Sequence, residues 1–320
     1  MNGALIIDKP VGWTSHDVVA RVRRVLGERR VGHTGTLDPF ATGVLVVLVG
    51  RATRLAQFLA GAEKEYDALV RLGYATETGD LTGAPLAPAG DISDVMTRDE
   101  AQFEASLSAL RGEIEQVPPM YSAKKVQGRK LYELARRGEH VERKAARVTI
   151  REFEIAPDEA GAWLYRNDDG TCDLRVRVAC SAGTYIRVLA EDLGALVGVG
   201  AHLAALRRTR AGAFRLAEAV TLEDLAERAG TGGAGELLIA PDATLPELPF
   251  VHLTAEDARR ARHGAAVRIS RAAGSSWREG ERVRMRAGGA GDLIAVGVYD
   301  AARMSLQPRV MLADGGDHNL

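Results

Sequence analysis

The chain has 320 residues, a formal net charge of −1, 46% hydrophobic residues and 27% charged residues. These proportions are typical of a globular protein, and the length allows one large domain and a small one. Two cysteines cannot form a disulfide framework, the net charge argues against a generic nucleic-acid binder, and no run approaches the ~18 apolar residues of a membrane span. Because the N-terminus lacks a charged leader and a long apolar run, we expect no secretory signal and a cytoplasmic location.

Hydrophobic periodicity predicts the elements of the first quarter of the chain. Residues 4–8 form a short strand, and Ser15 caps a helix in which apolar side chains recur at helical spacing. Residues 44–49 are a buried strand, and residues 51–59 a helix. Residues 64–72 alternate between polar and apolar, which predicts a strand with one buried face.

The middle of the chain contains two segments rich in turn residues. Residues 76–93 are predicted to be a surface loop because Thr, Gly, Pro and Asp dominate there. A capping box at residues 97–100 begins a helix, for which Gly112 is the expected stop. Residues 118–147 are polar and basic, and their length suits an insertion that closes over a ligand. A long strand at residues 174–180 and a helix that ends near Gly198 follow.

The last third contains a break and then short strands. Six residues at 230–235 include four glycines, and residues 241–249 contain three prolines, which is typical of a connector between domains. Four strand-like runs come after it, at residues 266–269, 282–286, 293–299 and 309–312. The whole pattern predicts an α+β protein with a mostly antiparallel mixed sheet flanked by helices.

The most informative segment is Gly32-His33-Thr34-Gly35-Thr36-Leu37-Asp38-Pro39. It places one carboxylate in a glycine-containing turn between a basic helix and a buried strand. Pro39 biases Asp38 away from helical backbone angles. A carboxylate on such a rigid turn is suited to act as a nucleophile or base, although an isolated Asp in a loop more often caps its turn.

This segment resembles the catalytic loop of the bacterial tRNA pseudouridine-55 synthases, which modify the T-loop. Three further blocks resemble the same family in order and spacing: Asp8-Lys9-Pro10-Val11-Gly12, residues 118–132 with Pro119-Met120-Tyr121-Ser122-Ala123 and Gln127-Gly128-Arg129, and Cys180-Ser181-Ala182-Gly183-Thr184-Tyr185-Ile186-Arg187. The resemblance covers about residues 3 to 312. It implies a pseudouridine synthase fold in a catalytic domain at residues 1–245, with an RNA-binding insertion at about 114–147. It also implies a small all-β, PUA-like RNA-binding domain at residues 250–314.

Pseudouridine formation breaks the bond between uracil N1 and the sugar, turns the base and rejoins it through C5, after the base has been extruded from the RNA. The resemblance gives Asp38 the catalytic role, by attack at the sugar C1′ or by elimination to a glycal, and the sequence does not choose between these routes. Burial alone would raise the pKa of Asp38, so a fixed cation should lie beside it. Arg187 fits, because a guanidinium can pair bidentately with a carboxylate.

The resemblance also assigns five substrate-binding residues. Tyr66 stacks against the target base or acts as the base of a glycal route, and Tyr185 and Leu206 line the pocket. Lys9 supports the pocket or contacts phosphate, and His33 fills the space that the extruded base leaves. Taken singly, Tyr66, Tyr185 and Leu206 are more typical of core packing, and a lone loop histidine such as His33 is more often a solvated side chain.

Three basic clusters flank these blocks and favour an RNA partner. Residues 111–151 contain eleven Lys and Arg against five Glu, and the other clusters lie at 21–30 and 207–210. No phosphate loop, dinucleotide fingerprint or zinc pattern is present, so we expect no cofactor and no metal. The expected partner is the T-arm of tRNA, bound by a monomer. Two alternatives stay open: an RNA-binding protein with an inactive pocket, and a guide-RNA-dependent relative.

Overall fold

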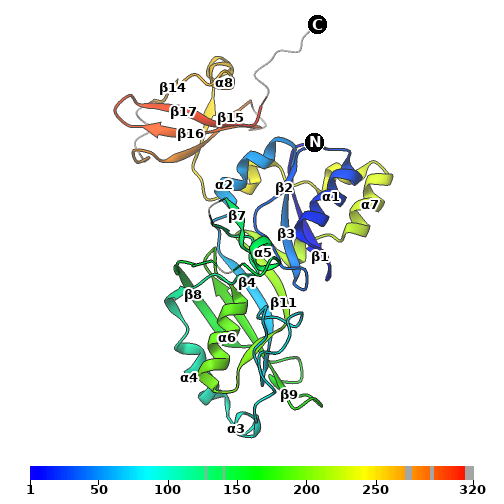
Figure 1. The fold of residues 1–320 in the computed structure, drawn as a ribbon. Coiled ribbons are helices and arrows are strands. Elements are labelled where there is room, and N and C mark those ends of the chain that lie inside the picture. Colours follow the sequence, from blue (N-terminus) through cyan, green and yellow to red (C-terminus); the bar gives the residue numbers. More distant parts are fainter. Residues whose placement is uncertain (127, 140, 271–275, 289–291, 314–320) are drawn as a thin grey trace.

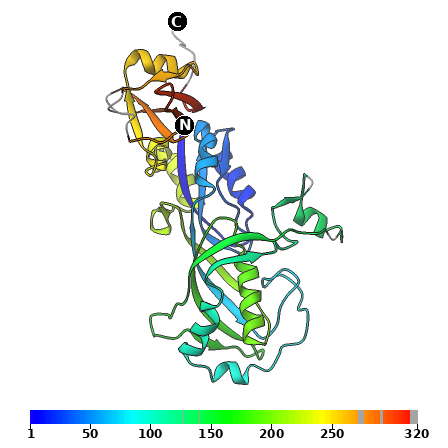
Figure 2. The same cartoon turned by 90° about the vertical axis from the view of Figure 1, so that its left-hand side faces the viewer.

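The computed structural model describes residues 1–126, 128–139, 141–270, 276–288 and 292–313. The described residues form two large sheets with separate cores and a third, two-stranded sheet in the insertion. The smaller of the two large sheets, near the C-terminus, lies at one end of the elongated molecule (Figures 1 and 2). Among the described residues, no helix has the length and apolar character needed to cross a bilayer.

The large sheet has ten strands and is mostly antiparallel, which confirms the predicted fold class. Its main path runs in the order β1 (Gly3–Lys9), β3 (Thr42–Val49), β11 (Ala201–Ala211), β4 (Lys64–Leu72), β10 (Cys172–Cys180), β8 (Ala146–Ile155) and β5 (Gly112–Gln116). Three short strands pair outside this path: β2 (Val31–His33) with β3, β9 (Leu164–Arg166) with β10, and β12 (Phe214–Arg215) with β11.

The sheet contains one parallel contact, between β3 and β11, where Thr42 faces Arg207 and Gly43 faces Arg208. The backbones approach closely here, because a Cβ atom at Gly43 would lie 2.2 Å from the carbonyl oxygen of Arg208. Gly43 also has a φ of +96°, which other residues adopt only at a cost. This glycine therefore allows the strand after the Asp38 loop to join the strand that carries Leu206 and Arg208.

Helices cover the two halves of the large sheet (Figure 1). The helices α1 (Ser15–Leu26) and α7 (Leu222–Gly230) contact each other, and their apolar side chains share a core with β1 and β3. In the other half, α4 (Glu100–Ser108) and α6 (Ile186–Val197) pack over β4, β8, β10 and β11. The apolar spacing in the sequence predicted α1 and α6, whereas α7 was not predicted.

Local capping differs from the prediction in two helices. Thr14, and not Ser15, caps α1, and it forms a capping box with Asp17. Asp99 caps α4 with Gln102, because Thr97 already ends the short helix α3 (Ser93–Met96). Since α4 ends at Ser108, Gly112 does not stop it but begins β5. The predicted helix at residues 51–59 is a 3₁₀ turn, η1 (Gly50–Leu55), followed by α2 (Ala56–Leu59).

The basic insertion contains β6 (Lys125–Val126), β7 (Arg129–Lys130) and the short helix α5 (Leu131–Ala135). It projects from the body of the molecule as an arm (Figure 2). At the base of the arm, the Arg143 guanidinium donates a hydrogen bond to the carbonyl oxygen of Pro118, at 3.0 Å. Gln127 of the family-like block lies outside the described residues.

The C-terminal domain has five strands, in the order β13 (Phe250–Leu253), β15 (Arg282–Ala287), β16 (Asp292–Asp300), β17 (Ser305–Met311) and β14 (Val267–Arg268). One helix, α8 (Ala255–Arg262), packs on this sheet, and neither it nor β13 was predicted. Two 3₁₀ turns, η3 (Gly233–Leu237) and η4 (Pro241–Thr244), occupy the predicted break and connector. The boundary between the two domains, at residues 245–250, stays our proposal. The predicted end of the C-terminal domain, residue 314, lies outside the described residues.

Asp242 of η4 connects the two domains. Its carboxylate accepts hydrogen bonds from Arg284 at 3.0 Å and from Arg286 at 2.8 and 2.6 Å, and both arginines belong to β15. The Arg286 guanidinium lies 3.7 Å from the centre of the Phe250 ring. An apolar cluster that includes Leu55 and residues of the C-terminal sheet packs nearby. The contact is therefore both apolar and ionic.

We expect Asp242→Ala to weaken the docking of the C-terminal domain by about 2 kcal/mol, because it leaves two guanidinium groups without their carboxylate. Amide hydrogen exchange of β15 would report the loss as reduced protection. Arg303→Ala is a suitable control, since it removes an ion pair with Asp300 in which the Arg303 side chain is 83% exposed. Unchanged protection of β15 in the Asp242 variant would contradict this account.

Candidate active site

A pocket of about 270 Å³ lies where the Asp38 loop meets the large sheet. Its walls come from five segments: the Asp38 loop, β4, β11, the loop leading into α6, and the insertion. The charged and aromatic residues that line it are Asp38, Lys64, Tyr66, Tyr185, Arg187 and Arg208, together with Leu206, Ser122 and Ser181. Five of the seven predicted site residues therefore line this pocket, whereas Lys9 and His33 do not: Asp38, Tyr66, Tyr185, Arg187 and Leu206.

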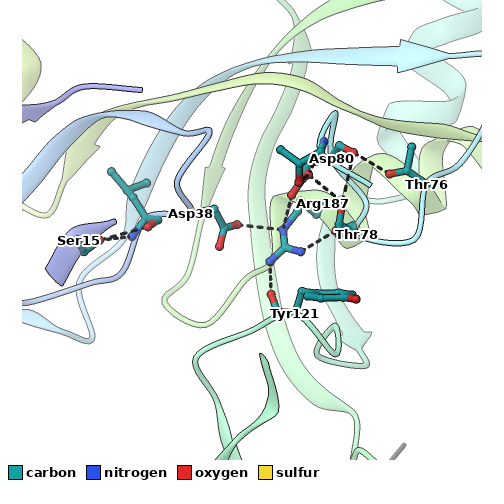
Figure 3. Close-up of polar contacts among 9 residues, drawn as sticks. Ser15, Asp38, Thr76, Thr78, Asp80, Tyr121 and Arg187 are labelled. Carbon is teal, nitrogen blue, oxygen red and sulfur yellow. Dashed lines mark hydrogen bonds and ion pairs between the residues drawn. The ribbon is translucent and has the colours of Figure 1, made fainter. Parts of the chain in front are cut away.

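Asp38 and Arg187 lie side by side, although 149 positions separate them in the sequence (Figure 3). Arg187 Nε donates a hydrogen bond to Asp38 Oδ2 at 2.9 Å. The other two guanidinium nitrogens donate to the carbonyl oxygens of Thr78 and Tyr121, each at 2.6 Å. Three separate segments thus fix the orientation of the Arg187 side chain.

A second carboxylate, Asp80, faces the same guanidinium, with Oδ2 at 3.9 Å from Arg187 Nε (Figure 3). The Asp80 side chain is buried, and Thr78 and Thr82 donate hydrogen bonds to its Oδ1. The sequence prediction missed this residue, because residues 76–93 were expected to be a surface loop. The loop instead pairs with β11 through Leu203, which turns Asp80 inward. The sequence signal for this arrangement is the segment Thr78-Gly79-Asp80-Leu81-Thr82, which is typical of a local Asx-type turn.

The pocket shifts the pKa of Asp38. Burial raises this pKa above its usual value, the Arg187 guanidinium opposes the rise, and the Asp80 carboxylate adds to it. The Arg187 side chain is 4% exposed, whereas 35% of the Asp38 side chain is open to the pocket. The ion pair therefore keeps a reactive carboxylate accessible and encloses its partner.

The loop that carries Asp38 is held from behind by α1. Ser15 Oγ accepts a hydrogen bond from the Leu37 amide at 2.9 Å and donates to the Leu37 carbonyl at 3.2 Å. The predicted cap residue Ser15 is thus buried and positions the residue next to Asp38. This contact explains why a hydroxyl stands at the first turn of α1, one residue after the true cap.

Lys9 supports the same loop from the other side. Its ammonium donates hydrogen bonds to the carbonyl oxygens of Pro10 at 2.9 Å, Trp13 at 2.6 Å and Pro39 at 3.2 Å. The side chain is fully buried, and burial lowers its pKa to about 8. Lys9 does not line the pocket, so of its two expected roles this arrangement favours support of the loop over contact with phosphate.

Tyr66, Leu206 and Tyr185 form the apolar part of the pocket. Tyr66 extends from β4, and burial raises the pKa of its phenol. Leu206 lies on the neighbouring strand β11, opposite Ala68. The Tyr185 amide donates to Gln116 Oε1 at 2.9 Å, which fixes the residue before α6. These side chains add two aromatic rings and one aliphatic group to the wall of the pocket that contains the ion pair.

His33 lies at the end of β2 and is not part of the pocket wall. Its ring packs edge-on against His16, with the ring centres 5.6 Å apart. Burial lowers its pKa to about 4, so the imidazole is neutral at pH 7. Its buried Nδ1 has no hydrogen-bond partner among the described residues. The structure thus places His33 on the loop of Asp38 but outside the pocket.

The arrangement has the chemistry of an anionic nucleophile or base in a partly apolar cavity. Within the described part of the chain, no group of three or more His, Cys, Asp or Glu side chains is placed to hold a metal ion. Cys172 and Cys180 are buried, and burial raises the pKa of each thiol to about 11. The carboxylate of Asp38 is thus the strongest candidate for covalent chemistry in the pocket.

We expect Arg187→Gln to raise the pKa of Asp38 further, because the guanidinium is the main group that opposes the effect of burial. Carboxyl carbon chemical shifts measured by NMR across a pH series would show the shift. Arg177→Gln is the matched control, since Arg177 is half exposed and its nearest carboxylate is Asp67. An Asp38 titration that stays in place when Arg187 is removed would disprove the coupling.

Comparison with known proteins agrees with this site. The sequence matches the TruB family pseudouridylate synthase (N terminal domain) over residues 23–186, and the tRNA pseudouridylate synthase B C-terminal domain over residues 187–238. It is 50% identical over 271 residues to the tRNA pseudouridine synthase B of Thermobifida fusca, a match that covers 83% of this chain and 86% of that protein. It is 47% identical to the tRNA pseudouridine synthase B of Geobacillus thermodenitrificans, and this match covers 84% of this chain and 86% of that protein.

A solved structure with a similar fold agrees with these sequence matches. One chain in the crystal structure of a Cbf5–Nop10–Gar1 complex matches with a TM-score of 0.69 and 26% identity, covering 98% of this chain and 85% of that one. The sequence matches span the Asp38 loop, the insertion and Arg187. The chain therefore belongs to the TruB family of pseudouridine synthases.

Proposed function

We propose that this pseudouridine synthase isomerises the T-loop uridine at position 55 of tRNA, with Asp38 as the catalytic carboxylate. The relatives with about half of their residues identical are named tRNA pseudouridine synthase B. The observation that carries the proposal is the contact between Asp38 and Arg187, because it combines an accessible carboxylate with a buried, fixed cation. A tRNA substrate also agrees with our expectation of a cytoplasmic protein.

The reaction requires a carboxylate that is ionised when the flipped nucleotide enters. In one route, Asp38 attacks C1′ while the bond from C1′ to N1 breaks. In the other, a base removes the C2′ proton and the sugar becomes a glycal. Arg187 serves both routes, because it stabilises the ionised form of Asp38. We propose that Tyr66, which lines the pocket beside Asp38, stacks on the base or acts through its phenol in the glycal route.

The surroundings of the pocket suit a folded RNA substrate. The insertion supplies Ser122 and Ala123 to the pocket wall and the Tyr121 carbonyl to Arg187, so RNA bound by the arm is coupled to the site. We propose that the arm and the basic clusters recognise the T-arm by shape and phosphate contacts. His33 would fill the gap left in the RNA stack, for which a neutral imidazole outside the pocket is suitable. Lys9 would hold the catalytic loop.

A guide-RNA-dependent enzyme is the second candidate, because the solved neighbour comes from a multi-protein complex. Relatives named tRNA pseudouridine synthase B that match over more than four-fifths of both chains favour the stand-alone form. Incubating the purified chain with unmodified tRNA alone, and mapping the modified positions, separates the two. Conversion at position 55 without any added RNA or protein would support our proposal.

Asp38→Asn should abolish pseudouridine formation while tRNA binding survives, because the amide is isosteric but is neither nucleophilic nor basic. Tritium release from tRNA labelled at uracil C5 measures turnover, and filter binding measures affinity. We expect a rate at least about 10⁴-fold lower, as is typical when a covalent catalyst is removed. Turnover close to that of the wild type in Asp38→Asn would exclude Asp38 as the catalytic group.

Tyr66→Phe should impair catalysis more than affinity, since the ring still stacks but the phenol is lost. We expect a fall of about 10²-fold in the single-turnover rate if the hydroxyl transfers a proton, with binding within about threefold of the wild type. Tyr165→Phe, on the distant hairpin strand β9, is a matched control. Equal losses of rate and affinity would contradict the role proposed for Tyr66.

A further inference from the structure

Two buried cations in the pocket wall have no carboxylate partner. Lys64 is 8% exposed and Arg208 is 2% exposed, and both line the same pocket as Asp38. The Lys64 ammonium donates to the carbonyl oxygens of Ala60, at 2.8 Å, and Ala62. Arg208 donates from Nε to Val44 O at 2.7 Å and from Nη2 to Gly35 O at 3.1 Å. Within the described residues, neither side chain forms an ion pair.

The nearby acids are already paired elsewhere. Glu63 and Glu65, which flank Lys64 in sequence, accept hydrogen bonds from Arg210 at 2.8 and 3.0 Å. Asp38 and Asp80 both face Arg187. Burial, together with the nearby charge of Arg208, lowers the pKa of Lys64 to about 8. A buried ammonium in this state is costly and gains most from a new anionic neighbour.

Strand geometry places these cations around the base-stacking residue. Lys64 and Tyr66 are two residues apart on β4, so their side chains lie on the same face of the sheet. Arg208 is the cross-strand partner of Tyr66 on β11 and shares that face. The Asp38 loop passes over them, since a Cβ atom at Gly35 would lie 3.6 Å from Arg208 Nη1 and 3.9 Å from Lys64 Cε. A base stacked on Tyr66 would have both cations at its edge.

We propose that Lys64 and Arg208 form an anion site for the departing uracil. This inference rests on the proposed function. In either route the bond between N1 and C1′ breaks with its electron pair on the base, so uracil leaves as an anion whose charge spreads over N1 and the carbonyl oxygens. In the covalent route Asp38 Oδ bonds to C1′, and in the glycal route the C2′ proton is removed and a C1′–C2′ double bond forms.

In the second half of the reaction, the base loses its negative charge. After the base turns, C5 bonds to C1′, the bond to Asp38 breaks or the glycal regains its proton, the C5 proton leaves, and N1 is protonated. Atoms and electrons are conserved, and no cofactor takes part. Between the two bond changes the free base must be held as an anion. Buried, preorganised donors that face the developing charge stabilise it most, because they do not need to reorganise.

The test compares leaving groups. Purified full-length wild type, Lys64→Met and Lys64→Arg are each reacted in single turnover with unmodified tRNA that carries uridine or 5-fluorouridine at position 55. Loss of the starting nucleoside is measured after nuclease digestion and mass spectrometry, because 5-fluorouridine has no C5 proton to lose and, once rejoined through C5, takes up water at C6 instead of forming pseudouridine. Fluorine stabilises the base anion, so 5-fluorouridine needs less help from the protein. Arg166→Met, which removes an exposed arginine of β9 outside the basic clusters, is the control for simple loss of positive charge.

With uridine we expect Lys64→Met to react about 10²-fold to 10³-fold more slowly than the wild type, as when one donor of an oxyanion hole is lost. With 5-fluorouridine the loss should be about tenfold smaller, and Lys64→Arg should restore most of the rate, because the charge is what matters. Binding of tRNA should change by less than about threefold, and Arg166→Met should leave both binding and the single-turnover rate unchanged.

Equal losses on both substrates, or loss of affinity with an intact single-turnover rate, would overturn the anion site. If Lys64→Met does not fold, as judged by its thermal unfolding, Lys64→Gln replaces it in the same comparison. The wild-type reactions distinguish a failure of the proposed function from a failure of the anion site alone. If the wild type converts no uridine at position 55, the proposed function fails. If it does and the Lys64 variants match it, only the anion site fails.

Discussion

The site depends on one electrostatic constraint: a carboxylate must stay ionised in a cavity that disfavours charge. Burial and the second carboxylate, Asp80, both raise the pKa of Asp38, and the Arg187 guanidinium is what opposes them. Arg187 can do this only because it is immobile. Hydrogen bonds to the backbone of the Asp80 loop and of the insertion hold it in place, at 2.6 Å each. The fold around the pocket brings these segments together at one guanidinium.

Buried polar contacts also position the loop that carries Asp38. Lys9 and Ser15 both use buried polar groups to satisfy backbone atoms of the loop, at residues 37 and 39. Neither side chain lines the pocket, yet both define where Asp38 lies. The close parallel contact at Gly43 then brings β11 beside the loop, and with it Leu206 and Arg208. Apolar burial stabilises these strands, while the polar contacts fix the position of the carboxylate.

The peripheral parts of the molecule connect to this centre in different ways. The insertion contacts the guanidinium directly, because Arg187 donates a hydrogen bond to the Tyr121 carbonyl oxygen. The C-terminal domain instead contacts the rest of the molecule at η1 and at Asp242. Basic clusters at residues 21–30, 111–151 and 207–210 occur in a chain with a net charge of −1, so the positive charge is concentrated in a few segments without making the whole protein basic.

The sequence by itself determined the α+β class, the strands β1, β3, β4 and β10, and the segment that carries Asp38. Each of these follows from local periodicity or from a contiguous motif. Only the tertiary structure decided the position of Asp80, since a carboxylate in a Thr- and Gly-rich loop is buried only if a distant cation, here Arg187, receives it. It also decided that Ser15 faces the loop while Thr14 caps the helix, and that His33 lies outside the pocket. The physical reason is that propensity and spacing act over a few residues, whereas burial and charge pairing depend on which segments the sheet brings together.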